Sequence, residues 1–179
     1  MRYLTNEDIE IKASNLLNEL KAMAAPIRVD AVAHRMGLLV EEIPLGDEIS
    51  GVLVIENGQG TIGINKNHAP VRKRFSIAHE IGHYVLHRKE SELFIDKKFA
   101  AVFRDNKSST GEYRIEIQAN LFAASLLMPR YLLEKEIKVL GLDLGDDLIL
   151  ERLAGKFEVS VQAMTYRLSN LATSLMPSF

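Results

Sequence analysis

The pattern with the clearest chemistry is His79-Glu80-Ile81-Gly82-His83, two histidines four residues apart with a glutamate beside the first. On an α-helix, residues i and i+4 lie one turn apart on the same face, so both imidazoles can bind one metal ion. Zinc bound in this way lowers the pKa of its water ligand to about 7. Glu80 can take a proton from that water and pass it to a leaving amine. The pattern therefore predicts a catalytic Zn²⁺ site with His79 and His83 as metal ligands and Glu80 as the catalytic base.

The flanks of this motif indicate a helix in the core and argue against a solvated helix with two surface histidines. Ala78, Ile81 and Val85 recur at helical spacing around it. Two buried imidazoles without partners are costly, and a metal ion would satisfy them. Gly82 is a further sign, because glycine inside a helix costs about 1 kcal/mol relative to alanine. We expect another element to pack closely at that position.

The expected partner is a helix that starts near Glu116 and ends before Pro129. Its small residues Ala119 and Ala123 share a face with Glu116 and Asn120, so its backbone can come close to the histidine helix. Glu116 can then supply a carboxylate oxygen as the third metal ligand. Asn120, one turn later, can form a hydrogen bond that orients a ligand histidine.

Other ionisable residues near this pattern offer alternatives. Glu112 lies one turn before Glu116 on the same face and is either a solvated charge or the ligand itself; the alanine-lined spacing favours Glu116. His87 continues the histidine row, but a straight helix cannot present three successive turns to one tetrahedral ion. We interpret it as a helix-end residue near the negative end of the dipole. His34 and His68 have no ligand-like neighbours and are expected to be ordinary surface or loop residues.

The elements that must position these residues follow from periodicity and turn signals. A helix is expected from the N-cap Thr5 to before Pro26, then a shorter helix closed by Gly37. The expected strands are 38–43, 51–55, 61–64 and 99–104, the middle two forming a hairpin, and 106–111 reads as a loop beside the cleft. A hairpin strand at a sheet edge could pair with an extended substrate peptide; simply completing a small sheet is the equal alternative.

The C-terminal segment predicts two helices, 148–157 and 161–171, with Ser160 as N-cap of the second. This arrangement is like a DNA-binding helix-turn-helix. The second helix, however, offers only Arg167 as a cation, and phosphate neutralisation dominates affinity for DNA. Packing or partner docking is favoured, and no specific nucleic acid binding is expected. We divide the chain into a zinc domain, 1–145, and a C-terminal helical segment packed on it, 146–179.

Composition limits the class of protein further. A chain of 179 residues can form one substantial core, and its net charge of −2 predicts no nonspecific attraction to DNA or anionic membranes. The absence of cysteine leaves His, Glu and Asp as metal ligands. The first residues lack the apolar core of a signal peptide, and no stretch has the apolar length of a membrane span. A cytoplasmic protein is expected.

These motifs together resemble the ImmA/IrrE family of zinc metallopeptidases. The resemblance covers roughly residues 29–130 and includes two upstream patterns. The two upstream patterns are Ile49-Ser-Gly51 and Ile62-Gly-Ile-Asn65. The two central motifs are His79-Glu-x-Gly-His83-Tyr-x-Leu-His87 and Glu116-x-x-Ala-Asn120-x-Phe-Ala-Ala-x-Leu-Leu-Met-Pro129. In this family the third zinc ligand is a glutamate on a separate helix, which matches Glu116. One departure is Gln118, where members often have a second acidic residue.

The resemblance implies an α+β fold: a small, mainly helical gluzincin-like domain with a small, mostly antiparallel β-sheet, followed by helix-turn-helix-like helices. It also implies a zinc-dependent endopeptidase of limited specificity with a regulatory role, and a helix-turn-helix transcriptional repressor as protein substrate. The alternative is a non-catalytic binding module that keeps zinc for structure and regulates a transcriptional partner by docking. Catalysis, unlike docking, needs an open coordination position and access for a peptide.

Overall fold

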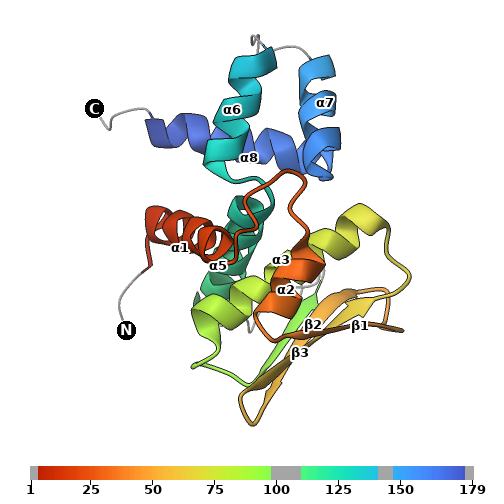
Figure 1. Ribbon diagram of the computed structural model, residues 1–179. Helices are drawn as coiled ribbons and strands as arrows, with labels where there is room; N and C mark the ends of the chain where they lie inside the picture. The colour runs from red at the N-terminus through yellow and green to blue at the C-terminus, as the bar shows by residue number, and fades with distance from the viewer. Residues whose placement is uncertain (1–3, 98–109, 141–146, 176–179) are drawn as a thin grey trace.

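A four-stranded sheet forms one side of the molecule, and helices cover one face of this sheet (Figure 1). The computed structural model describes residues 4–97, 110–140 and 147–175. Its strands are β1 (Leu39–Ile43), β2 (Ile49–Glu56), β3 (Gln59–Asn65) and β4 (Leu93–Lys97). Its helices are α1 (Asn6–Glu19), α2 (Val29–Arg35), α3 (Pro70–His87), α5 (Thr110–Leu127), α6 (Arg130–Leu140), α7 (Asp147–Phe157) and α8 (Val161–Leu175). The expected α+β class, with mainly helical content, is confirmed.

The strands lie in the order β1-β3-β2-β4, with β1 parallel to β3 and the other pairs antiparallel. The predicted hairpin is present as β2 and β3. Both are interior strands, so the idea that a hairpin strand forms the substrate-binding edge is wrong; in the described chain the edges are β1 and β4. The sequence pattern did not identify β4, and the expected strand at 99–104 lies outside the described residues.

A β-bulge at Ser50 shapes the part of β2 that faces α3. Ile49 pairs with Lys97 and Gly51 with Asp96, so Ser50 is an extra residue between two ladder pairs. Strand residues normally alternate between the two faces of a sheet. Here Ser50 and Gly51 are both buried, because a bulge re-aims one side chain. The bulge thus brings two successive residues of β2 to the helix-covered side.

The close contact between α3 and α5 is the one expected from Gly82. A Cβ added at Gly82 would lie 3.1 Å from the carbonyl oxygen of Ala119, 3.2 Å from its Cα and 3.3 Å from Cβ of Phe122. These distances leave little room for any side chain. Ile77, Ala78 and Ile81 on α3 belong to the same buried core. The prediction that a second helix packs against this glycine is confirmed.

Helix boundaries agree with the sequence signals in most places. Thr5 forms a capping box with Asp8, whose backbone N–H donates to Thr5 Oγ1 at 3.1 Å. Ser160 caps α8 by accepting from the backbone N–H of Ala163 at 3.1 Å. The expected loop is wrong at Thr110 and Gly111, which begin α5; the local turn signal there is outweighed by continuation of a well-packed helix. Residues 106–109 of that loop lie outside the described part.

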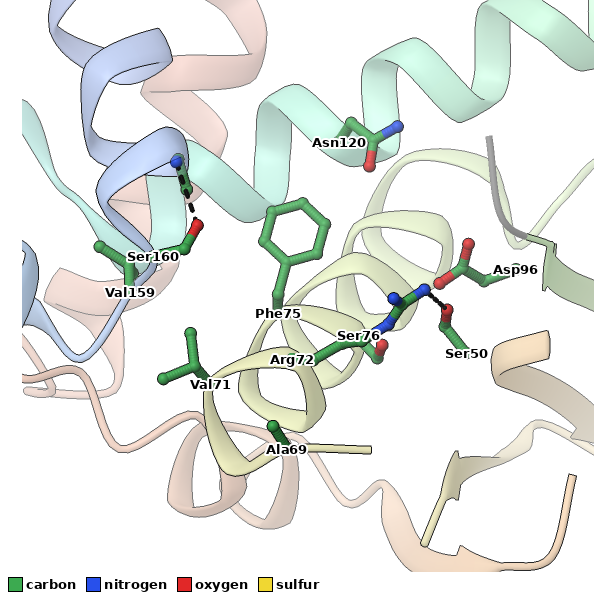
Figure 2. A pocket seen from close by; sticks show the side chains of 11 residues that line it. Ser50, Ala69, Val71, Arg72, Phe75, Ser76, Asp96, Asn120, Val159 and Ser160 are labelled. Carbon is green, nitrogen blue, oxygen red and sulfur yellow. Dashed lines mark hydrogen bonds between the residues drawn. The ribbon is translucent and has the colours of Figure 1, made fainter. Parts of the chain in front are cut away.

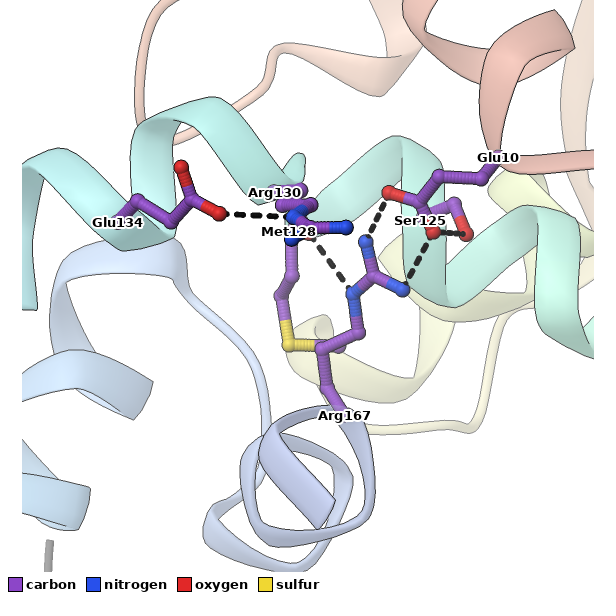
Figure 3. A network of polar contacts seen from close by, with 6 residues as sticks. All are labelled: Glu10, Ser125, Met128, Arg130, Glu134 and Arg167. Atoms are coloured by element: carbon purple, nitrogen blue, oxygen red, sulfur yellow. Dashed lines mark hydrogen bonds and ion pairs between the residues drawn. The ribbon is translucent and has the colours of Figure 1, made fainter. Parts of the chain in front are cut away.

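Arg167 joins α8 to the rest of the molecule (Figure 3). Its side chain is only 2% exposed. The guanidinium donates to both carboxylate oxygens of Glu10 on α1, at 2.7 Å for Nη1–Oε2, and through Nε to the carbonyl of Met128 at 3.0 Å. Ser125 on α5 also donates to Glu10, at 2.9 Å. Arg167, the single Lys or Arg of α8, is therefore engaged inside the protein and is not available to phosphates.

This arrangement changes the pKa of the Glu10 carboxyl group. Burial alone would raise its pKa, but the hydrogen bond and positive charge of Arg167 lower the pKa below the usual value. The ion pair therefore contributes stability at neutral pH that is lost as the pH falls through the lowered pKa of the folded state.

None of the described helices is long and apolar enough to cross a membrane. The boundary proposed at residue 145 lies outside the described residues and stays a prediction.

Arg167→Ala should destabilise the fold by about 2–3 kcal/mol, because it leaves the Glu10 carboxylate partly buried without its cation. Arg130 provides a matched control: its pair with Glu134, at 2.7 Å, has both side chains about half exposed. Arg130→Ala should change stability by no more than about 0.5 kcal/mol. Urea unfolding at pH 7 measures both variants. Equal effects would show that the buried pair has no special role.

Candidate metal centre

His79, His83 and Glu116 converge on one point between α3 and α5. The Nε2 atoms of the two histidines are 2.9 Å apart. Glu116 Oε2 lies 3.2 Å from Nε2 of His79, and its Oε1 lies 3.3 Å from Nε2 of His83. The histidines are one turn apart on a helix, and the glutamate reaches them from α5 because the two helices touch at Gly82. The three predicted ligands are thus brought together.

These three side chains fit a tetrahedral metal ion. For metal–ligand bonds of about 2.0–2.2 Å, neighbouring ligand atoms of a tetrahedron are about 3.3–3.6 Å apart. The observed separations of 2.9–3.3 Å need only a small expansion to reach that spacing. The donors are two imidazole nitrogens and a carboxylate oxygen, and both histidines are buried. Such a group can bind a metal ion, and three protein ligands leave one position open for water.

Two further contacts orient the ligand histidines. Asn120 Oδ1 lies 3.1 Å from His79 Nδ1, so this nitrogen can donate to the amide and leave Nε2 for a metal. Phe94 of β4 stacks on the ring of His83, with centroids 4.6 Å apart and an interplanar angle of 19°. Asn120 was expected next to a ligand, and its contact is to His79. Phe94 was not foreseen.

The electrostatics favour one positive charge in the centre. Burial would raise the pKa of Glu116, but hydrogen bonds to His79 and His83 lower it to about 2. Burial lowers the pKa of His83 to about 4. For His79, burial acts in the same direction, but the hydrogen bond to Glu116 and nearby carboxylates outweigh it and raise the pKa to about 9. A proton on His79 balances Glu116 here, and a bound cation would take over that role.

Glu80 lies beside the three ligand side chains without joining them. Its side chain is fully buried, and neither carboxylate oxygen has a hydrogen-bond partner among the described residues. Burial raises the pKa of Glu80 to about 8, against the lowering effect of His79. Gly51 of β2 lies directly against it, since a Cβ there would be 2.8 Å from Glu80 Oε1. A buried carboxyl group without hydrogen-bond partners is costly.

Asp96 is a site residue that the sequence did not single out. It lies on β4, and it offers an oxygen that, with one atom each of His79 and Glu80, forms a group within 4.8 Å. Burial raises the pKa of Asp96, while the positive charges of His79 and Arg72 oppose this change. Its position two residues after Phe94 places both on the inward face of the strand. The alternation of inward and outward residues was the sequence signal available for Asp96, but a strand of five residues is too short for this alternation to be recognised.

The remaining candidates are placed as follows. His87 is the last residue of α3, as expected, and is buried with Nδ1 3.4 Å from Glu90 Oε1; it is not in the metal-binding group. His34 is exposed and His68 lies in the turn before α3, half-buried. The side chain of Glu112 is not described, so the choice of Glu116 rests on the contacts of Glu116 itself.

The sequence also matches a known protein family. Residues 33–169 match the Peptidase_M78 family model, described as the IrrE N-terminal-like domain. The chain belongs to this family. The resemblance of the sequence to ImmA/IrrE peptidases is thereby confirmed, and the match extends through the start of α8. Among curated proteins, none matches the sequence.

A solved structure has a similar fold. It is a Mycobacterium tuberculosis transcriptional regulator, with a TM-score of 0.62 and 18% sequence identity. The similarity covers 91% of this chain and 46% of that chain, so the protein spans about half the length of the regulator. At this identity the likeness shows a shared fold.

Metal content tests the ligand assignment. We expect one zinc ion per chain, lost largely in His79→Ala, His83→Ala and Glu116→Ala, because each removes one of three protein ligands. Asn120→Ala should keep all three candidate metal ligands but weaken the affinity for zinc by about 10–100-fold, since the ring of His79 is then less well oriented. Elemental analysis and competition with a chelator measure both. Glu112→Ala is the control; loss of zinc there, with retention in Glu116→Ala, would reverse the choice of carboxylate.

Proposed function

We propose that this chain is a zinc-dependent endopeptidase of limited specificity. The observation that carries the proposal is the fully buried Glu80 carboxylate, without a described partner, beside the converging His79, His83 and Glu116. Those three side chains would hold Zn²⁺, which supplies a polarised substrate carbonyl and an activated water when bound. Membership of a peptidase family supports this reaction class.

Glu80 would perform the proton transfers. Its side chain is next to the metal-binding group and has no hydrogen-bond partner in the described chain. A bound cation would lower its raised pKa, and the carboxylate could then accept a proton from the attacking water. The same group can deliver that proton to the leaving amine. Asn120 would act through His79, by holding its ring with Nε2 toward the metal.

An extended peptide could reach the centre along β4. In the described chain this strand pairs only with β2, which leaves its other edge open. Its residues Phe94 and Asp96 lie beside the metal-binding group. A peptide that adds to a strand edge forms main-chain hydrogen bonds with little sequence dependence. The substrate-binding edge imagined for the hairpin is therefore assigned to β4 in this proposal.

The substrate we propose is a protein in transcriptional control, such as a helix-turn-helix repressor, cleaved in the cytoplasm. Family membership supports a regulatory peptidase, and the structural neighbour is named a transcriptional regulator. This proposal includes no specific DNA binding, since the Arg167 guanidinium on α8 is paired with Glu10. The alternative, a docking module that keeps its metal for structure, has the burial of His79 and His83 in its favour but leaves Glu80 without a role.

Glu80→Gln separates the two functions. The variant should bind zinc and unfold like the wild type, yet cleave a purified helix-turn-helix repressor at least about a hundredfold more slowly, the range for loss of a general base. Single-turnover cleavage and elemental analysis provide the readouts. If wild type and variant relieve repression equally in cells, the docking alternative is correct.

Gly51→Ala should act on the same carboxylate from the other side. The new methyl group would meet Glu80 Oε1 at 2.8 Å and displace it, while the metal ligands stay in place. A displacement near 1 Å can lower a rate by about 100-fold, so cleavage should fall without loss of zinc. Gly63→Ala is a matched control, because its Cβ would be 2.7 Å from Ile43 on the opposite sheet face. Equal losses of activity would attribute the effect to general strain in the sheet.

A further inference from the structure

A cavity of about 430 Å³ lies next to the metal-binding group (Figure 2). Its apolar walls include Phe75 of α3, Val159 just before α8 and Ala163 in the first turn of α8. Figure 2 shows Phe75 directed into the space between these two helices. The volume is within the usual range of small-molecule pockets, about 300–1,000 Å³.

The cavity and the metal-binding group share residues. Asn120 lines the cavity and also contacts His79 at 3.1 Å. Asp96 lines it and belongs to the group that includes His79 and Glu80. The ring of Phe75 is 6.5 Å from the ring of His79, centroid to centroid. A peptide held with a carbonyl at the metal would therefore have a neighbouring side chain at the mouth of this cavity.

Two residues of opposite charge, Arg72 and Asp96, line one end of the cavity. Arg72 donates to Ser50 Oγ at 2.8 Å, and Figure 2 shows its guanidinium between Ser50 and Asp96. The Arg72 charge also acts on Asp96. Because these charges offset each other, a charged ligand side chain would lose hydration without gaining an unpaired partner. An apolar side chain suits the Phe75, Val159 and Ala163 walls instead.

We propose that this cavity binds a large apolar side chain, such as leucine, methionine or phenylalanine, of the residue flanking the scissile bond. The first turn of α8 and the residues just before it would then be part of the substrate-binding surface and would set specificity through Ala163 and Val159. The chemical class of the substrate side chain rests on the proposed peptidase function. The cavity itself, and its preference for apolar groups, can be tested without any cleavage.

The test uses the full zinc-loaded chain carrying Glu80→Gln, so that no probe is hydrolysed. The probes are N-acetyl amides of leucine, phenylalanine, glycine and aspartate, followed by changes in backbone amide NMR signals. The leucine and phenylalanine probes should shift the signals of Phe75, Val159 and Ala163, and the glycine and aspartate probes should not. Ala163→Phe fills the cavity and should weaken binding of the leucine probe by about tenfold or more.

Gln162→Phe is the matched control, because Gln162 is exposed in the same turn of α8 and should leave binding unchanged. If Ala163→Phe does not fold, Val71→Phe narrows the same cavity from an exposed position on α3. Equal shifts with all four probes, or binding unaffected by both filling variants, would overturn the proposal. Apolar probes bound by a wild-type chain that cleaves no protein would reject the peptidase function alone and leave the cavity assignment standing.

Discussion

The approach of α3 and α5 at Gly82 is the constraint on which the rest of the site depends. The carbonyl oxygen of Ala119 comes within 3.1 Å of where a Cβ would stand, so any side chain at position 82 would push the helices apart. Glu116 reaches both ligand histidines at 3.2 and 3.3 Å only because α5 runs this close to α3. Glycine in a helix costs about 1 kcal/mol. That cost is offset by packing of a continuous core. The close approach of the two helices sets the spacing of the candidate ligand atoms of His79, His83 and Glu116.

The site places more ionisable groups in the interior than stability alone would favour. Glu80 and Glu116 are carboxylates among buried imidazoles, and Asp96 adds a third at the sheet side. Burial of charged groups is unfavourable unless they are paired. Glu116 has its pairing through the histidines, and Asp96 lies near Arg72, but Glu80 has none among the described residues. Burial raises the pKa of Glu80 to about 8, so without a metal this group is protonated at neutral pH. A divalent cation bound nearby would lower that pKa and so make the Glu80 carboxylate available as a base.

Local patterns in the sequence were sufficient for the features that depend on one helix or one turn. Helical spacing identified His79 and His83, and a glycine with an alanine-lined partner identified the α3–α5 contact and Glu116. Features that depend on distant pairing were missed. Asp96 enters the site because β4 pairs with β2 across a bulge, which no local signal in five residues shows. Arg167 reads as an exposed cation on an amphipathic helix, but its partner Glu10 is 157 residues away. Tertiary contacts, not propensity, decided both positions.

The same distant ion pair connects the two ends of the chain with the cavity. Arg167 holds α8 against α1 and α5 from within the interior. Ala163 lies one turn earlier in α8, and Val159 lies just before the helix begins. Arg74 of α3 adds a second connection, since it hydrogen-bonds the carbonyl of Ile27 at 2.9 Å and pairs with Glu158 at 3.2 Å. The start of α8 is therefore fixed on both sides relative to the metal-binding helix. A wall fixed in this way can discriminate between side chains by size, because a rigid surface cannot move aside at low cost. The C-terminal helices thus have a physical reason to be part of the family fold even though they carry no metal ligand.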